Sequence, residues 1–329
     1  MINVINNYNN PYFNLALEEY FLKYKDLQDD ILILWQNEPV IVIGKNQNTY
    51  EELNLHYVDS KNIKVVRRLS GGGAVYHDLG NLNFTIIESN SNIHKNDFSF
   101  FALPVISCLS KLRIKATFSG RNDILIDGKK FSGNAQYFYK DKLLHHGTLL
   151  FISDLTVLSK ALNVKKDKFQ SKGIKSVGSR VTNISDYIDL NIPLKKFKDM
   201  IIKSIFEDKK EKVENYVLTN DDIEKVNELV KNKYGTWEWN FGKSSKFNYK
   251  KEMRFNSRTV SIMMNVVEGI IKNFKIYGDF FEENPVEELE KLFINKRFEI
   301  VELKDMLKKI NISNYILNLN NKDFIQLFL

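Results

Sequence analysis

The sequence predicts a mixed α/β (α+β) protein of two domains, the larger one built on a mixed, largely antiparallel sheet and the smaller one an α/β appendage. The 329 residues, 43% of them hydrophobic, exceed what one compact core usually holds. Apolar strand-like runs follow one another without the regular βαβ alternation of a doubly wound fold. A polar stretch rich in lysine and serine follows Gly242, which places the domains at residues 1–245 and 246–329.

The first quarter of the chain is predicted to hold a helix and a buried hairpin. Apolar residues from Asn14 to Lys25 recur in a helical rhythm, after a Pro11 that suits a helix entry. The runs at residues 31–35 and 40–44 are continuously apolar, as in strands covered on both faces. Because a short QNEP turn separates them, we expect the two runs to pair, with a further helix near residues 50–60.

The middle of the chain is predicted to supply most of the sheet. Strands are expected at KVVRR, residues 64–68, and at LNFTIIE, residues 82–88. Asp97 can cap a helix that runs to Leu112. Three strands joined by tight turns are expected within residues 123–152, followed by helices within residues 194–234.

The C-terminal appendage has about 80 residues, near the low end of the sizes that fold independently. Residues 253–280 are expected to form strands around a VEG turn. Helical segments are expected at residues 285–293, 303–310 and 323–329.

Composition excludes several classes of protein. The single cysteine, Cys108, lies among apolar neighbours, so we expect a small buried hydrophobe in a reducing compartment. No apolar run approaches the roughly 20 residues of a membrane helix, and the N-terminus resembles no targeting peptide. The charge of +7 comes from scattered lysines without an RNA-binding motif. We expect a cytoplasmic, soluble protein that binds neither nucleic acid nor membrane.

The segment RRLSGGGAVYHDLGN, residues 67–81, carries the strongest chemical signal. Its three consecutive glycines let backbone N–H groups approach a ligand closely, and Arg67 and Arg68 can pair with phosphate or carboxylate oxygens. The spacing matches neither a P-loop nor G-x-G-x-x-G. A glycine triplet alone is more often a flexible turn, but its place between two apolar strands favours an anion-binding loop.

A second constellation spans residues 120–136, where Asp123 opens one predicted strand and Lys130 begins the next. A lysine followed by Ser-Gly-Asn could bring its ammonium against a small-residue surface where an acyl-phosphate fits. An ordinary hairpin lysine is the competing interpretation, and spacing alone favours it.

Two further motifs are weaker. His145 and His146 are adjacent in one predicted strand, so they point to opposite faces and do not readily ligate one metal. Gly147 beside them permits a close backbone approach. The glycines and basic residues within Ser171 to Ile184 suggest a mobile, anion-contacting loop, although a solvated loop explains them equally well.

Taken together and in order, these motifs resemble the lipoate-protein ligase A family. The matching segments are RRLSGGGAVYHDLGN, GRNDILIDGKKFSGNAQ, HHGTLL and KGIKSVGSRVTNI, together with PYFNLALEEY, VIVIGKNQN and WEWNFG. The resemblance implies a catalytic domain like those of class II aminoacyl-tRNA synthetases and biotin ligases, followed by a small α/β accessory domain.

The resemblance also implies a two-step reaction that salvages lipoate. The lipoate carboxylate attacks the α-phosphate of ATP to give lipoyl-AMP and pyrophosphate, and a carrier lysine then displaces AMP to form an amide. Mg²⁺ is implied as the ion that neutralises the triphosphate. The implied partners are apo lipoyl carriers, either E2 subunits of 2-oxoacid dehydrogenases or the glycine-cleavage H protein.

The resemblance assigns roles to particular residues. Lys130 matches a lysine that contacts both nucleotide and lipoyl carbonyl, and its cation would offset developing oxyanion charge by an amount on the order of 3 kcal/mol. Arg68, Gly73, Ala74, Val75 and Tyr76 match adenylate-binding positions. The other expected binding residues are Arg67, Ser70, Gly71, Gly72, Asn81, Asp123, Gly133, His146, Gly147 and Thr148. The ligands of the metal stay unknown.

Other functions fit less well. An octanoyl- or lipoyl-transferase of the same fold needs an activated cysteine and no ATP, yet Cys108 lies outside every motif. A biotin ligase would carry a different recognition loop, and a nucleic-acid-binding module has only net charge in its favour. A catalytically silent lipoyl-binding scaffold is disfavoured by the presence of Lys130.

Overall fold

The computed structural model describes residues 1–25, 27–90, 93–120, 122–162, 181–188, 192–208, 210–242, 248–255 and 258–328. The chain divides into two compact units, each described by itself below. The first unit comprises Met1–Val42, Glu52–Arg67 and Val75–Asn240, and the second comprises Ile43–Glu51, Arg68–Ala74 and Phe241–Leu329. Two short segments of the N-terminal third, one of them the glycine triplet, therefore pack with the C-terminal region.

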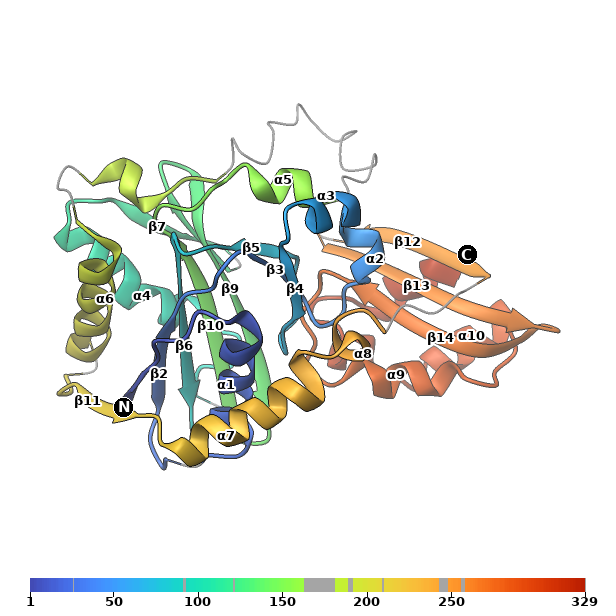
Figure 1. Ribbon diagram of the computed structural model, residues 1–329. Helices are drawn as coiled ribbons and strands as arrows, with labels where there is room; N and C mark the ends of the chain where they lie inside the picture. The colour runs from blue at the N-terminus through green and yellow to red at the C-terminus, as the bar shows by residue number, and fades with distance from the viewer. Residues whose placement is uncertain are drawn as a thin grey trace. The chain divides into compact units, whose positions relative to one another are not determined.

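The first unit is built on an eight-stranded mixed sheet with the order β11-β1-β2-β6-β10-β9-β8-β7 (Figure 1). Its strands are β1 (Ile2–Ile5), β2 (Ile31–Trp35), β6 (Asn81–Glu88), β7 (Ala116–Ser119), β8 (Asp123–Ile126), β9 (Lys129–Tyr139), β10 (Lys142–Leu150) and β11 (Glu214–Val217). β1 runs parallel to β2 and β11, whereas the remaining neighbours pair antiparallel. The predicted mixed, largely antiparallel sheet is confirmed.

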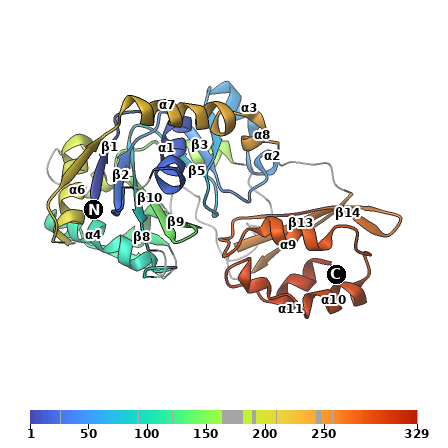
Figure 2. The same cartoon turned by 90° about the horizontal axis from the view of Figure 1, so that it is seen from below.

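Helices cover both faces of this sheet, which is why its central strands are apolar on both sides. The helices of the first unit are α1 (Pro11–Lys23), α3 (Leu55–Ser60), α4 (Phe98–Lys111), α5 (Val157–Ala161), η3 (Ile184–Tyr187), α6 (Leu194–Asp208), α7 (Asn220–Leu229), η4 (Val230–Tyr234) and α8 (Trp237–Asn240). In β6, Phe84 belongs to the core formed with α4 and α6, whereas Thr85 bonds to α1 on the other face. Figure 2 shows α1 and α4 on opposite sides of the strands.

The starts of α1 and α4 follow from local sequence. Asn10 caps α1 by accepting hydrogen bonds from two backbone N–H groups, and Pro11 occupies the first turn, where a missing N–H costs nothing. Asp97 caps α4 by accepting from the N–H of Phe100 at 3.1 Å, as the sequence predicts. Pro104 lies inside α4 without ending it.

The predicted hairpin between residues 31–35 and 40–44 is wrong. β2 pairs with β1 and β6, while β3 (Val40–Ile43) lies in a separate three-stranded sheet between β4 (Lys64–Arg67) and β5 (Val75–His77). Two continuously apolar runs can each be buried by any partner strand, so closeness along the chain does not fix which strands pair.

The C-terminal part of the second unit packs helices on a three-stranded antiparallel sheet. Its elements are β12 (Tyr249–Phe255), β13 (Arg258–Val267), β14 (Ile270–Gly278), α9 (Val286–Phe293), α10 (Ile300–Leu307), η5 (Ile312–Asn314), α11 (Asn321–Phe324) and η6 (Ile325–Phe328), and the short helix α2 (Thr49–Glu52) starts within Ile43–Glu51. Glu268 and Gly269 both have positive φ, as the predicted VEG turn between β13 and β14 requires. Phe274 stacks on Phe293 with ring centroids 4.4 Å apart in the core of this unit.

Across the part of the chain that the structure describes, no helix combines the length and apolar character needed to cross a membrane. Cys108 lies on the buried face of α4, and burial raises the pKa of its thiol to about 11. The prediction of a small buried hydrophobe at this position is confirmed.

Candidate functional site

Residues 68–74, here called the glycine loop, are folded around one arginine in the second unit. The guanidinium of Arg68 donates to Ser70 Oγ at 3.0 Å and to the carbonyl oxygens of Gly71 at 2.6 Å and Gly73 at 2.9 Å. Three charge-assisted hydrogen bonds to one short loop fix its backbone before any ligand arrives. Arg68 therefore stabilises the conformation of the loop backbone.

The three glycines of the loop serve different purposes. A methyl group on Gly71 would lie 2.2 Å from the carbonyl oxygen of Phe280, so packing excludes any side chain there. Gly72 has φ of +90°, which L side chains rarely adopt. Gly73 is exposed, and a methyl group on it would meet nothing within 4 Å. The packing of the described residues therefore does not require glycine at position 73, and the loop backbone is exposed there.

The residues that flank the loop lie in the first unit. Val75 and Tyr76 belong to β5 and are half-buried. Burial, followed by the nearby charge of Asp78, raises the pKa of Tyr76 to about 12, so its phenol stays protonated at neutral pH.

Arg67 is fully buried and ties β4 to α8. Its guanidinium donates to the carbonyl oxygens of Trp239 at 3.1 Å and Asn240 at 3.2 Å, and the indole N–H of Trp239 returns a 2.8 Å bond to the Arg67 carbonyl. These bonds satisfy a buried cation with backbone acceptors. The two adjacent arginines thus have separate environments, Arg68 in the glycine loop and Arg67 against α8.

A second group of predicted residues gathers on β8, β9 and β10 of the first unit. Lys130 Nζ lies 2.7 Å from Asp123 Oδ1, with about a third of each side chain exposed. A methyl group on Gly133 would lie 2.7 Å from that Nζ, so the ammonium rests directly over this glycine. The pairing of β8 with β9 shifts register at this point, which lets Lys130 and Gly133 lie on the same side.

Strand β9, which carries Lys130, is held in place by residues of the HHGTLL motif on β10. The N–H of Gly133 donates to Thr148 Oγ1 at 3.2 Å. Gly147 lies opposite Asn134, and a methyl group on it would come within 2.2 Å of the Asn134 amide oxygen. Gly147 is therefore needed for close packing of β9 on β10, and Thr148 for holding the backbone under Lys130.

The two histidines point to opposite faces of β10, as predicted. His145 is enclosed by Phe84 and Phe101 and lies within hydrogen-bond distance of Asn134 and Gln136. Burial, and secondarily His146, holds its pKa well below the usual value, so the ring is neutral. Within the described residues, no cluster of three His, Cys, Asp or Glu side chains could hold a metal.

His146 belongs to a buried polar network that sequence reasoning missed. Its Nδ1 lies 2.9 Å from Glu18 Oε1, and the same oxygen accepts a 2.5 Å hydrogen bond from Thr85. Trp35 Nε1 in turn donates to Thr85 Oγ1 at 2.9 Å. The signal in the sequence was that Glu18 follows Asn14 by four residues, which places two polar residues on one helical face that is otherwise apolar.

Asn81 is buried at the start of β6 and leaves one acceptor unsatisfied. Its Nδ2 donates to Asn83 Oδ1 at 2.9 Å, whereas its own Oδ1 accepts no hydrogen bond from the residues described. A buried acceptor of this kind calls for a donor from water or ligand. Its place at the end of the HDLGN motif agrees with a binding role.

The fourth predicted motif, Ser171 to Ile184, lies outside the described residues up to Arg180. Its last part meets the lysine strand, since the N–H of Thr182 donates to the Lys130 carbonyl at 3.0 Å. This contact brings the end of the motif beside the candidate catalytic lysine.

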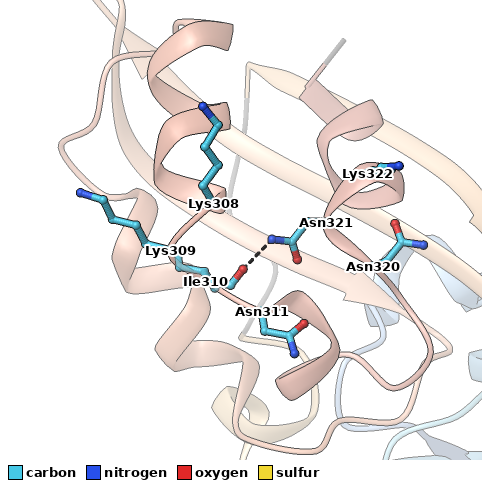
Figure 3. A pocket seen from close by; sticks show the side chains of 7 residues that line it. All are labelled: Lys308, Lys309, Ile310, Asn311, Asn320, Asn321 and Lys322. Carbon is cyan, nitrogen blue, oxygen red and sulfur yellow. Dashed lines mark hydrogen bonds between the residues drawn. The ribbon is translucent and has the colours of Figure 1, made fainter.

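A shallow surface pocket in the second unit involves none of the predicted residues (Figure 3). Lysine and asparagine side chains surround it, and Asn321 donates to the carbonyl of Ile310 at 2.5 Å. The pocket lies at the end of α10 and the start of α11, and nothing in its lining connects it to the glycine loop or to Lys130.

Two family models match this chain. Residues 10–206 match the family described as the lipoyl protein ligase A/B catalytic domain, and residues 244–328 match the bacterial lipoate protein ligase C-terminus. The chain is 44% identical over 322 residues to lipoate-protein ligase LplJ of Bacillus subtilis (strain 168), covering 98% of this chain and 97% of that one. Lipoate–protein ligase 1 of Staphylococcus aureus (strain Mu50) is 40% identical, with 98% of each chain covered.

Solved structures support the same assignment. Plasmodium falciparum LipL1 in complex with lipoate aligns with a TM-score of 0.81 and 27% identity over 99% of this chain and 97% of that one. A lipoate-protein ligase A bound with ATP aligns with a TM-score of 0.65 and 27% identity over 73% of this chain and 98% of that one. The predicted fold class is confirmed. The chain belongs to the lipoate-protein ligase family and is an enzyme.

Proposed function

We propose that this ligase works by an ATP-dependent adenylate mechanism, with Lys130 as its catalytic residue. The observation that carries the proposal is the position of the Lys130 ammonium, over Gly133 and beside Asp123. A fixed cation over a side-chain-free surface leaves room for a planar acyl group or a phosphate to lie against it. Solved relatives with lipoate and with ATP bound support the two substrates.

In the first half-reaction a lipoate carboxylate oxygen attacks the α-phosphorus of ATP. The bond from that phosphorus to the bridging oxygen of pyrophosphate breaks, and lipoyl-AMP forms. Negative charge grows on the phosphoryl oxygens as the bond order changes, and the Lys130 ammonium is the donor that offsets it. Asp123 holds that ammonium in place, because a carboxylate 2.7 Å away restricts the flexible lysine stem.

In the second half-reaction a neutral lysine amine of the carrier attacks the lipoyl carbonyl carbon. The bond between that carbon and the phosphate oxygen breaks, AMP departs with the electron pair of that bond, and the proton lost by the amine passes to water or to the departing phosphate as the amide forms. Charge now develops on the carbonyl oxygen, and the same ammonium stabilises it. One lysine therefore serves both steps without itself exchanging a proton.

Nucleotide binding is proposed for the glycine loop and its flanks. Gly73 leaves its backbone open to a ligand, and Arg68 holds the carbonyls of Gly71 and Gly73, so we propose that the loop backbone at Gly73, rather than the Gly72 N–H that bonds to Phe280, meets phosphate oxygens. Asn81 has a buried acceptor that a ligand donor would satisfy. The remaining proposed binding residues are Arg67, Ser70, Gly71, Gly72, Ala74, Val75, Tyr76, Asp123, Gly133, His146, Gly147 and Thr148.

Mg²⁺ fits this chemistry without a preformed protein cage. It usually binds one or two carboxylates together with the phosphates of its substrate, so the lack of a three-ligand cluster among the described residues is compatible with its use. Asp123, partly exposed beside Lys130, is the carboxylate of this group that could hold it. The ion would neutralise the triphosphate and make pyrophosphate a better leaving group.

We propose a catalytic domain at residues 1–245 and an accessory domain at residues 246–329. The C-terminal family match begins at residue 244, just before this boundary, and the catalytic-domain match ends earlier, at residue 206. The carriers proposed are E2 lipoyl domains and the glycine-cleavage H protein. A bi-partite ligase of Thermoplasma acidophilum was solved in a study of its system with an E2 lipoyl domain, which supports the first class. A cytoplasmic location is proposed because lipoate salvage meets such carriers there.

Intact-mass analysis tests the mechanism and the carrier together. Purified protein is incubated with ATP, Mg²⁺ and lipoate, and with either an apo E2 lipoyl domain or an apo H protein, while pyrophosphate is measured. We expect pyrophosphate release and a lipoyl mass increment on at least one carrier. If no lipoyl-AMP forms while octanoyl groups pass from one carrier protein to another, the mechanism is a transferase one and the proposal fails.

A further inference from the structure

The glycine loop is docked on the C-terminal part of its own unit through backbone contacts. The N–H of Gly72 donates to the carbonyl of Phe280 at 3.1 Å, and Gly71 packs against the same carbonyl too closely to carry a side chain. The side chain of Phe280 is fully buried in the core of this unit. The carbonyl that accepts the hydrogen bond from the loop therefore belongs to a residue whose side chain is anchored in the core.

Residues 43–51 form a second layer between the loop and β14. The N–H of Lys45 donates to the Ser70 carbonyl at 2.8 Å, and the N–H of Gly278 donates to the Asn46 carbonyl at 2.7 Å. A methyl group on Gly44 would lie 2.0 Å from the carbonyl oxygen of Gly72. The loop, this segment and the end of β14 are consequently packed backbone to backbone.

One buried ion pair joins these layers through side chains. Lys45 Nζ contacts Glu282 Oε1, and the two side chains are only 11% and 8% exposed. The Glu282 carboxylate also receives hydrogen bonds from Asn46 Nδ2 at 3.4 Å and from the N–H of Val286 at 3.3 Å, at the start of α9. Lys45 Nζ also lies 3.5 Å from Glu287 Oε2, on a side chain that is 35% exposed. Glu282→Gln therefore leaves the ammonium only this more distant carboxylate, whereas Lys45→Met removes the cation that the buried Glu282 carboxylate contacts, which is costlier than losing an exposed pair.

We propose that Lys45 and Glu282 are positioning residues that hold the glycine loop in the conformation that binds ATP. Lys45 is one residue from Gly44, which touches Gly72, and Glu282 is two residues from Phe280, which binds Gly72. The ion pair thus joins the two segments that pack against the glycine loop, one containing Gly44 and the other containing Phe280. Neither residue contacts the reacting atoms in this proposal, which rests on the proposed function of the loop.

Two single variants and their combination test the pair. Glu282→Gln and Lys45→Met are each compared with the double variant in ATP–pyrophosphate exchange and in transfer from chemically prepared lipoyl-AMP to an apo carrier. We expect each single variant to raise KM for ATP about tenfold, with kcat of exchange within about threefold of wild type. The double variant should lose no more than either single one, because the two residues act as a unit. Lys45→Arg should restore most of the affinity.

A matched control exists in the same unit. Lys275 and Glu290, with side chains 32% and 8% exposed, form another ion pair, between β14 and α9, and neither residue bonds to the glycine loop in the contacts described. Lys275→Met and Glu290→Gln should lower Tm to a similar extent and leave KM for ATP within about twofold of wild type. If the control variants raise KM as much as Glu282→Gln, the effect is general destabilisation and the positioning role is refuted.

Hydrogen exchange of the unliganded proteins separates this inference from the proposed function. We expect the amides of residues 69–74 to exchange about tenfold faster in Glu282→Gln than in wild type, and at the wild-type rate in Glu290→Gln. Unchanged exchange in Glu282→Gln and Lys45→Met overturns the inference even if the enzyme forms lipoyl-AMP. If the loop amides exchange faster in Glu282→Gln but the wild-type enzyme forms no lipoyl-AMP, the positioning role of the ion pair is supported and the adenylate mechanism is refuted.

Discussion

The ammonium of Lys130 lies 2.7 Å from the Asp123 carboxylate and directly over Gly133, where any side chain would collide with it. Lys129, one position earlier, is exposed at the β8–β9 turn. Two adjacent lysines therefore differ completely in environment. Adjacent residues of a strand point to opposite faces, and the register shift between β8 and β9 brings Lys130 to the same side as Gly133.

Lys130→Ala is expected to abolish adenylate formation, whereas Lys129→Ala should be close to wild type. Loss of one preorganised donor at a developing oxyanion costs on the order of 10²–10³ in kcat, and more if it acts in both half-reactions. Pyrophosphate release and thermal unfolding of both variants provide the measurement. Lys130→Ala with activity within a few-fold of Lys129→Ala would remove Lys130 from the catalytic role.

Gly73→Ala is expected to weaken ATP binding without weakening the fold. A methyl group there meets no protein atom within 4 Å, so Tm should stay within about 2 °C of wild type, while KM for ATP should rise roughly tenfold. Gly120→Ala is the matched control, since a methyl group on Gly120 also meets nothing within 4 Å and this glycine belongs to the first unit. Gly71→Ala should behave oppositely, with a clear loss of Tm because its methyl group would collide with Phe280. Equal KM values for Gly73→Ala and Gly120→Ala would show that position 73 does not meet the nucleotide.

Cys108 is expected to be chemically silent in the folded protein. Because burial raises the pKa of its thiol to about 11, almost none is thiolate at pH 8, and access to reagents is blocked as well. A disulfide-exchange reagent should label it only after unfolding, and Cys108→Ser should keep ligase activity within about twofold. Rapid labelling of the native protein together with an inactive Cys108→Ser variant would revive the thioester transferase mechanism.

His145 is expected to make the fold sensitive to acid. Its pKa is depressed in the folded state and close to 6.5 in the unfolded state, so below that pH the unfolded chain binds the additional proton. The stabilisation is thus present above pH 6.5 and is lost progressively as the pH falls below that value. Urea unfolding of wild type and His145→Gln at both pH values measures this residue's share. An identical pH dependence in the two proteins would show that His145 is not buried as a neutral ring.

Most elements of the fold could be predicted from local sequence. Asp97 and the apolar face that follows it specify α4, and the turn at Glu268 and Gly269 specifies the β13–β14 hairpin. These signals lie within a few residues of the structure they produce. The short strands β1, β7 and β11 were missed, and β11 falls inside a stretch predicted to be helical. Each has only four residues, and those of β11 are mostly exposed, so pairing with neighbouring strands rather than a local apolar pattern makes them extended.

The sequence alone determined the family, the class of chemistry and the candidate residues, because three glycines, two arginines and a lysine at fixed places in ordered motifs are chemical information. Tertiary structure alone decided what those residues touch. It buried Arg67 against α8, folded the glycine loop around Arg68, and added Glu18 and the Lys45–Glu282 pair. Lys45 and Glu282, 237 positions apart in the chain, meet only when the core forms, and no local sequence pattern specifies the partner with which a buried charge will pair.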